Sequence, residues 1–326
     1  MISCTEFIPL YSEFFKYLDK DGGHDAVMEY WNYLSDKNIG DKTNPNSLGY
    51  KCEKFGGFDG ARAYWGHTLT EEACDLFEIC DNKNRFVYEH MRHCPSRGML
   101  NDLKHIEPYY DYCEHCKVIY SRVLEKYGVV YERDHSKINS AQCSSILYEK
   151  GNKPDIDFFN MTDDEIKKSV GTENITVTDL KTEDNKYLHR DFHLLSDFAL
   201  KYCGDKFGHD AVISFLTDYT KHYYSPQIEK FRAEGLAAIE KWIKHIYEIE
   251  EAPDVLQTEL MKDRLIVKIK KCPVIAYMRS LNQEPSEYYI EETKTLYGVI
   301  AEESGFKFAL KYYDTDGKTE FEFREK

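Results

Sequence analysis

The first half of the chain recurs in its second half, and this internal repeat limits the possible folds more than any other feature. Three segments return in the same order and at nearly constant spacing. One match alone would be weak, but three in register predict two homologous units built by duplication. The matched pairs are 14–27 with 199–212, Arg85 to Cys94-Pro95 with Arg264 to Cys272-Pro273, and 107–128 with 284–305.

Both units show the same predicted order of elements. A helical half comes first and includes expected helices at 61–79 and 228–249. A strand follows, and a Cys-Pro pair then opens a short helix, because proline at the first helical position sacrifices no needed donor. A longer helix ends at a glycine, Gly128 or Gly305, and two strands close the unit as a hairpin. The predicted strands are 85–91, 129–133 and 144–149 in the first unit and 264–270, 306–312 and 319–324 in the second.

The predicted fold class is therefore α+β, with helices packed on a small antiparallel sheet in each unit. The two tandem units are expected to be related by pseudo-twofold symmetry. The polar stretch between them has poor helical periodicity and contains one short candidate strand at 175–178. We expect domains at 1–150 and 188–326, joined by a linker at 151–187.

Charge and hydropathy exclude some classes of function. The formal net charge is -15, and no basic stripe is available to displace counterions from phosphates, so we expect no nucleic-acid partner. No apolar run approaches the length of a membrane span, and the start of the chain lacks the features of a signal peptide. We therefore expect a cytoplasmic monomer or homodimer without a membrane partner, whose ligand is a small molecule.

The reactive side chains are concentrated in the first unit. Ten cysteines in a reducing compartment are free thiols, metal ligands or nucleophiles. The corresponding part of the second unit keeps only Cys272, and duplicated proteins often retain one working site. The cluster in the first unit consists of His90, His93, Cys94, His105, Cys113, His115, Cys116, His135 and Cys143.

Cys94 is the first candidate residue. Because Pro95 follows it, Cys94 is expected at the cap of a helix, where backbone N–H groups and the helix dipole favour a thiolate. His90 and His93 stand at the end of the preceding strand, and either could act as a base or a ligand. The alternative is a simple strand-to-helix junction with a buried thiol. Cys272 occupies the same place in a unit without these histidines, which favours neither interpretation.

The second candidate is the pair Cys113 and Cys116. Three residues apart on a helix, they share a face, and a C-x2-C pair suits zinc or a redox dithiol. A tetrahedral metal site would need two more ligands, which Cys94 and Cys143 could supply if the fold brings them together. The alternative is plain burial of small apolar thiols in the core.

Three other motifs bear on the site. Glu132-Arg133 could bind a carboxylate through the arginine fork, or could be a solvated edge pair. The glycine-rich run 56–60 is expected to be a loop, not a phosphate cradle. His24-Asp25 and His209-Asp210 recur in both units, so we interpret them as helix-start structure.

Part of the first unit resembles a known family. Its run is Cys94-Pro95, then Tyr112-Cys113-Glu114-His115-Cys116, Gly128 through Glu132-Arg133, and Cys143 before the strand 146–148. This run resembles the L-2-amino-thiazoline-4-carboxylic acid hydrolase family over about sixty residues, and the second unit looks like a degenerate copy of the same unit.

The resemblance implies a hydrolase that opens a five-membered ring containing sulfur and a C=N bond. Water would add to the amidine-like carbon, and the C–S bond would open to give N-carbamoyl-cysteine. Such chemistry needs a base or a metal-bound hydroxide, and a cation for the substrate carboxylate. The alternative is a non-catalytic thiol protein that binds a metal, haem or small ligand as a sensor or carrier. The predicted residues are Cys94, Cys113 and His93 for catalysis, Arg133 and Tyr112 for substrate, and Cys94, Cys113, Cys116 and Cys143 for a zinc or iron ion.

Overall fold

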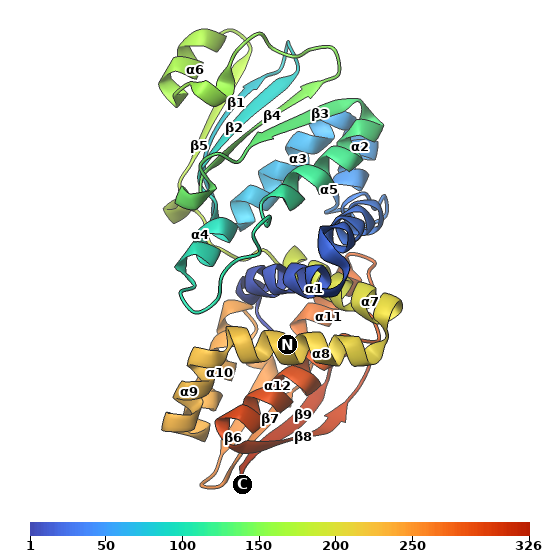
Figure 1. Cartoon of the computed structure of the whole chain (residues 1–326), viewed down its shortest axis with the longest axis vertical. Helices are drawn as coiled ribbons and strands as arrows, with labels where there is room; N and C mark the ends of the chain where they lie inside the picture. The colour runs from blue at the N-terminus through green and yellow to red at the C-terminus, as the bar shows by residue number, and fades with distance from the viewer. The chain divides into compact units, whose positions relative to one another are not determined.

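A computed structural model describes all 326 residues and confirms the α+β class. The chain divides into two compact units, each with one antiparallel sheet (Figure 1). We call residues 18–189 the N-unit, and residues 1–17 together with 190–326 the C-unit. The division differs from the expected domains at 1–150 and 188–326, because the first residues group with the C-unit and the stretch 151–187 groups with the N-unit.

The N-unit begins inside the first helix. Helix α1 (Phe7–Leu34) contains Gly23, whose positive φ of 64° interrupts the helical backbone just before His24. A glycine can adopt this conformation without the steric cost that a side chain would add. The remaining helices of the unit are α2 (Leu48–Phe55), α3 (Gly57–Glu71), α4 (Pro95–Asp102), α5 (Glu114–Leu124) and α6 (Asp163–Val170).

Five strands form the sheet of the N-unit. They are β1 (Asp75–Asp81), β2 (Phe86–His93), β3 (Val129–Asp134), β4 (Cys143–Glu149) and β5 (Ile175–Leu180). Their order across the sheet is β3-β4-β2-β1-β5, and every neighbouring pair is antiparallel. The helix that precedes β3 ends at Gly128, whose φ of 71° matches the predicted glycine stop.

The C-unit holds four strands and the remaining helices. Its sheet has the order β6-β7-β9-β8, again antiparallel throughout. The strands are β6 (Leu256–Leu260), β7 (Arg264–Ile269), β8 (Phe306–Tyr313) and β9 (Thr319–Glu325). The helices are α7 (Asp191–Phe207), α8 (His209–Tyr223), α9 (Ser225–Glu234), α10 (Leu236–Ile249), α11 (Pro273–Ser280) and α12 (Glu291–Ser304).

The two sheets share one topology. Strands β1, β2, β3 and β4 correspond in chain order to β6, β7, β8 and β9. With this correspondence, the N-unit order β3-β4-β2-β1 becomes β8-β9-β7-β6, which is the order of the C-unit sheet read from its β8 edge. In both units a Cys-Pro pair opens the helix after the second strand. In both units a histidine also begins a helical segment after a positive-φ glycine and pairs with an acid near the start of a later helix: His24 with Asp111, and His209 with Glu291.

Three local expectations need correction. The helix expected at 61–79 ends at Glu71, and β1 follows after Ala73, whose positive φ of 51° turns the chain without glycine or proline. The helix expected at 228–249 divides at Gly235, and β6 follows it. The glycine-rich run expected as a loop is instead the junction of two helices, because only Gly56 is non-helical and α3 begins at Gly57.

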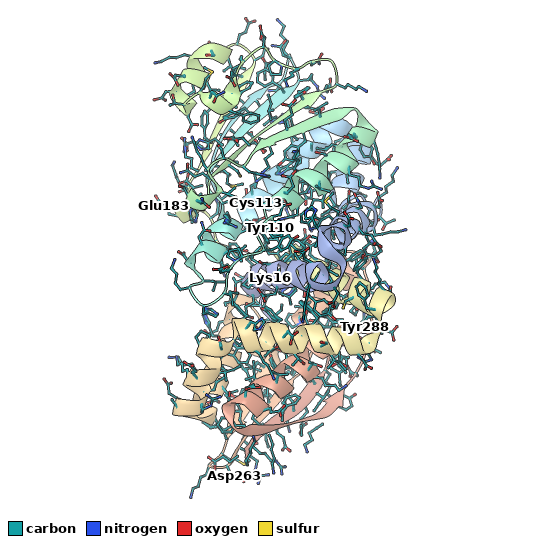
Figure 2. The ribbon with its side chains drawn as sticks, viewed as in Figure 1. Lys16, Tyr110, Cys113, Glu183, Asp263 and Tyr288 are labelled. Atoms are coloured by element: carbon teal, nitrogen blue, oxygen red, sulfur yellow. The ribbon has the colours of Figure 1, made fainter.

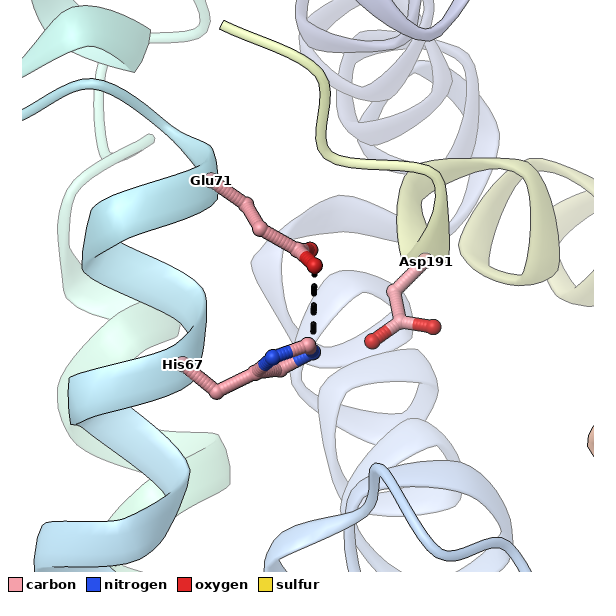
Figure 3. Close-up of side chains that lie close together, drawn as sticks. All are labelled: His67, Glu71 and Asp191. Atoms are coloured by element: carbon pink, nitrogen blue, oxygen red, sulfur yellow. Dashed lines mark ion pairs between the residues drawn. The ribbon is translucent and has the colours of Figure 1, made fainter. Parts of the chain in front are cut away.

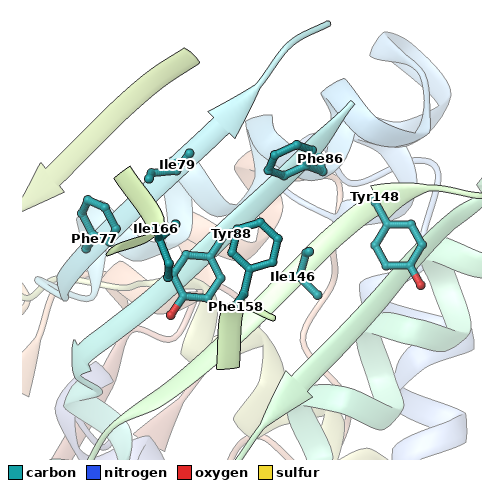
Figure 4. Close-up of a cluster of buried hydrophobic side chains, with 8 residues drawn as sticks. All are labelled: Phe77, Ile79, Phe86, Tyr88, Ile146, Tyr148, Phe158 and Ile166. Carbon is teal, nitrogen blue, oxygen red and sulfur yellow. The ribbon is translucent and has the colours of Figure 1, made fainter. Parts of the chain in front are cut away.

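The stretch 151–187 covers the outer face of the N-unit sheet instead of acting as a linker. Its strand β5 pairs along β1, and His90 and Arg92 of β2 hold Asp163 at the start of α6 with distances of 2.8 and 3.0 Å. The covered face is apolar, so exposure to water would be costly. The buried core between the sheet and the covering stretch consists of Phe77, Ile79, Phe86, Tyr88, Ile146 and Tyr148 from the sheet and Phe158 and Ile166 from the covering stretch (Figure 4).

Substitution of Ile166 tests this covering layer. Ile166 is fully buried against the sheet, so Ile166→Ala should lower the free energy of unfolding of the N-unit by roughly 2–5 kcal/mol. The control Val177→Ala, at a side chain that is 48% exposed on β5, should have a much smaller effect. Urea denaturation measures both, and equal effects would contradict the assignment of 151–187 as a core layer.

None of the helices is both long and apolar enough to cross a membrane.

Candidate functional site

A row of polar side chains crosses the inner face of the N-unit sheet. Phe77, Tyr88 and Ile146 point to the outer face, so their direct neighbours along each strand point inward. Cross-strand pairing then aligns one inward residue from each strand. From one edge of the sheet to the other, this polar row is Thr178, Glu78, Glu89, Ser145 and Arg133.

Helices α3 and α5 cover this inner face. The ring of Trp65 on α3 lies 5.5 Å from that of Tyr131 on β3, and Tyr120 on α5 contacts both rings at 5.0 and 6.1 Å. The end of α3 is fixed by an ion pair between His67 and Glu71 at 3.5 Å (Figure 3). These aromatic side chains cover part of the inner face, and Glu89 and Ser145 in the middle of the row are buried.

Arg133 stands at the β3 end of the row. Its Nη1 donates to the hydroxyl of Tyr131 at 2.6 Å, and its Nη2 donates to Sγ of Cys143 at 2.8 Å. Its Nε is buried without a hydrogen-bond partner, and the guanidinium is in no ion pair. The residue as a whole is half-buried, and the carboxyl groups of Glu72 and Glu89 act on its charge electrostatically without contacting it. An arginine normally binds a carboxylate directly, and no carboxylate of the chain makes that contact here.

The four predicted cysteines all lie in the electrostatic environment of Arg133. Its charge is among the influences that lower the pKa of each of these thiols. Figure 2 shows one of them, Cys113, at the start of α5. Cys143 contacts the guanidinium directly, and the charge of Arg133 reaches the other three. The four cysteines are Cys94, Cys113, Cys116 and Cys143.

Cys94 occupies the helix cap that the sequence predicts, but it is not a preformed thiolate. Its Sγ accepts a hydrogen bond from the backbone N–H of Arg97 at 3.4 Å. Burial nevertheless raises the pKa of Cys94 well above its usual value, because desolvation outweighs this donor and the charge of Arg133. Burial also raises the pKa of Cys113 to about 12 and raises the pKa values of Cys116 and Cys143.

Cys116 and His115 form the one thiol–imidazole contact in the cluster. Nδ1 of His115 is hydrogen-bonded to the backbone carbonyl of Tyr112, and this acceptor requires a proton on Nδ1. The lone pair on Nε2 then faces Sγ of Cys116 at 3.4 Å. Burial lowers the pKa of His115 to about 4, so the ring is neutral near pH 7 and its Nε2 lone pair can accept a hydrogen bond from the thiol.

The other predicted site residues have different surroundings. His93 is exposed, makes no hydrogen bond or ion pair, and packs against Gly98, so the structure does not support its expected role as a base. Tyr112 is buried, and its ring contacts that of His115 at 4.8 Å. His135 pairs with Glu114 at 3.3 Å, while its buried Nε2 has no hydrogen-bond partner.

The four thiols do not fit the zinc or iron ion that was considered for them. Zinc–sulfur bonds of about 2.3 Å would bring tetrahedral ligands close together. None of the four cysteines belongs to a group of three potential ligand atoms lying within 4.8 Å of one another. A metal cation here would also lie beside the charge of Arg133, and the repulsion would weaken its binding. The donor set suits an anion better than a cation.

The corresponding row of the C-unit has apolar residues in the places of Glu89, Ser145 and Arg133. Glu89 and Val267 each lie five residues before a Cys-Pro pair. Arg133 and Leu310 each lie five residues after the glycine that ends a helix, Gly128 or Gly305. The two correspondences agree with each other, because Val267 and Leu310 both pair with Phe321 and therefore lie in one row of the C-unit sheet. Thr258, Val267, Phe321 and Leu310 thus occupy the places of Glu78, Glu89, Ser145 and Arg133.

Glu89 is the site residue that the sequence predictions missed. It is 6% exposed and accepts a hydrogen bond from Oγ of Ser145 at 2.7 Å. Burial, together with the facing carboxylate of Glu78, raises its pKa to about 7. A signal was present in the sequence, since Val87, Glu89 and Met91 share one face of a strand and a charged residue there breaks the apolar pattern.

Comparisons with protein-family models, with curated proteins and with solved structures find no match for this chain. The resemblance to the thiazoline-carboxylate hydrolases therefore rests on the quoted residues alone.

Proposed function

We propose that this chain is a hydrolase that opens a small cyclic sulfur- and nitrogen-containing carboxylate, of the 2-aminothiazoline-4-carboxylate kind. The observation that carries the proposal is the charge of Arg133, which contacts the thiol of Cys143, acts on three further thiols and makes no ion pair with a carboxylate of the chain. We also propose that the two units arose by duplication and that the C-unit is the degenerate copy. The shared strand order and the apolar counterpart of the polar row support this second proposal.

Arg133 is the proposed carboxylate-binding residue. Buried charges are costly, and the C-unit builds the same sheet with Leu310 in this place, so the fold itself does not require the arginine. Arg97 also has a buried Nε without a hydrogen-bond partner, and its charge acts on Cys113. Two guanidinium groups near one thiol cluster provide the fork geometry that carboxylates bind.

Cys116 and His115 are the proposed nucleophile and base. His115 takes the proton of Cys116, and the thiolate adds to the amidine-like ring carbon. The ring C–S bond then breaks, and the departing sulfur receives the proton from His115. Water next displaces Cys116 from the same carbon, which gives N-carbamoyl-cysteine and restores the free thiol. The overall reaction consumes one water molecule.

Turnover of 2-aminothiazoline-4-carboxylate by matched cysteine variants tests this proposal. Cys116→Ala should lower kcat by roughly 10²–10⁴-fold, the range expected when a positioned proton-transfer pair is lost. The control Cys52→Ala removes a buried thiol of α2 outside the cluster and should retain activity. Equal activity of both variants would sink the role of Cys116. Binding of the substrate without turnover by the wild type would instead favour a non-catalytic ligand-binding protein.

A further inference from the structure

The polar row contains a buried acid, Glu89, that the proposed chemistry does not use. Glu89 lies two strands from Arg133, a Cα separation of about 10 Å, and Ser145 stands between them. The hydroxyl of Ser145 donates to Glu89, so this acid is held in the plane of the row. On its other side, Glu78 is the direct cross-strand partner of Glu89.

We infer that Glu89 is a positioning residue that controls how strongly Arg133 binds an anion, so that ligand binding is coupled to a proton on Glu89. This inference rests on the proposed function of Arg133. With the carboxyl group of Glu89 neutral, the only other acid of the row is Glu78, three strands from Arg133, and the guanidinium attracts an anion more strongly. With Glu89 ionised, its negative charge reduces the positive potential at Arg133, and the ligand binds less tightly.

The groups around Glu89 determine which protonation state it prefers. Burial and Glu78 both disfavour its ionised form, while Ser145 and Arg133 favour it. On α3, Arg62 acts on Glu78 and partly compensates that second acid. Because two facing carboxylates in a buried row repel each other, the row is built to keep one proton near neutral pH. Glu89 in turn helps to raise the pKa values of three other groups, which are Cys74, Tyr131 and Cys143.

The C-unit shows that this row is not needed for the fold. Its counterpart places Val267 and Phe321 where the N-unit has Glu89 and Ser145, and both apolar residues are fully buried. Apolar side chains therefore satisfy the packing of this sheet. A buried acid, a hydroxyl and an arginine in the same row are costly unless they serve binding, which is why we assign them to one proton-coupled anion site.

Calorimetric titration with thiazolidine-4-carboxylate tests the inference. This probe keeps the ring and the carboxylate but lacks the amidine carbon, so it cannot be opened by the proposed reaction. Wild-type affinity should fall several-fold as the pH rises from about 6 to about 8, because Glu89 ionises in this range. Glu89→Gln should bind tightly throughout the range without this pH dependence. Glu78→Gln should keep the dependence but move its midpoint to lower pH, because one source of repulsion is removed.

The outcomes separate the inference from the proposed function. Binding by the wild type and by Glu89→Gln with the same pH dependence would overturn the role of Glu89 and leave the anion site of Arg133 intact. Absence of binding to the wild type at every pH, together with absence of ring-opening activity, would overturn both. Turnover by the wild type with a pH-independent KM would again overturn only the role of Glu89.

Discussion

Arg133→Leu should weaken ligand binding and at the same time stabilise the protein. Loss of hydrogen bonds between a guanidinium and a carboxylate should weaken substrate binding by roughly 10- to 150-fold, which corresponds to about 1.5–3 kcal/mol. Replacing this half-buried charge, which makes no ion pair, with leucine, the residue at the corresponding place in the C-unit, should raise the free energy of unfolding by roughly 1 kcal/mol. Calorimetry measures the first effect, and urea denaturation measures the second.

Arg122→Leu is the matched control for this experiment. Arg122 makes an exposed ion pair with Asp36 at 2.6 Å on α5. Its loss should leave binding unchanged and lower the stability by at most about 1 kcal/mol, as expected for a surface pair. If Arg133→Leu lost stability instead, Arg133 would be a structural residue whose contacts with Tyr131 and Cys143 hold the sheet together.

Glu89→Gln should remove a pH-dependent loss of stability between about pH 4.5 and about pH 7. The pKa of Glu89 is raised from 4.5 to about 7, so the folded state keeps a proton that the unfolded chain releases. Stability from this group is therefore fully present below about pH 4.5, falls as the pH rises, and becomes constant above about pH 7. A difference of about 2.5 pKa units corresponds to roughly 3 kcal/mol.

The difference between wild type and variant isolates this contribution. His115 and His135, whose pKa values burial lowers to about 4, act in the opposite direction and stabilise the protein as the pH rises from about 4 to about 6.5. They are present in both proteins and cancel in the comparison. Urea denaturation at a series of pH values should give curves that converge at low pH and separate by pH 7, with the variant more stable. Parallel curves would show that the pKa of Glu89 is the same in the folded and unfolded states, which would contradict the raised value.

Local signals in the sequence predicted much of the fold. The Cys-Pro pairs, the glycines after the long helices and the alternation of the hairpin strands placed α4, α11 and strands β2, β3, β7 and β9 within one or two residues. Strand β1 was missed, because the chain turns at Ala73 without glycine or proline. The role of 151–187 was also missed, because its polar composition resembles a linker while its few apolar side chains, such as Phe158 and Ile166, cover the sheet.

The sequence supplied candidate site residues, but it could not show how the fold arranges them. The asymmetry between the units directed attention to the cysteines and to Arg133, and in the structure the charge of Arg133 acts on Cys94 and Cys143. Spacing along the chain could not show that His115 faces Cys116, because that contact depends on a ring orientation set by the carbonyl of Tyr112. Nor could spacing alone align Glu89 with Arg133, because their shared row depends on the pairing of three strands.

Alkylation by iodoacetate and iodoacetamide, with the modified cysteine identified by mass spectrometry, tests the central claim most directly. The two reagents deliver similar groups to a thiol, but only iodoacetate carries a carboxylate. If Arg133 binds anions beside a reactive Cys116, iodoacetate should modify Cys116 before the other cysteines and faster than iodoacetamide does, and Arg133→Leu should remove this preference. Slower reaction with iodoacetate, or first modification at a cysteine outside the cluster, would contradict an anion-guided thiol site.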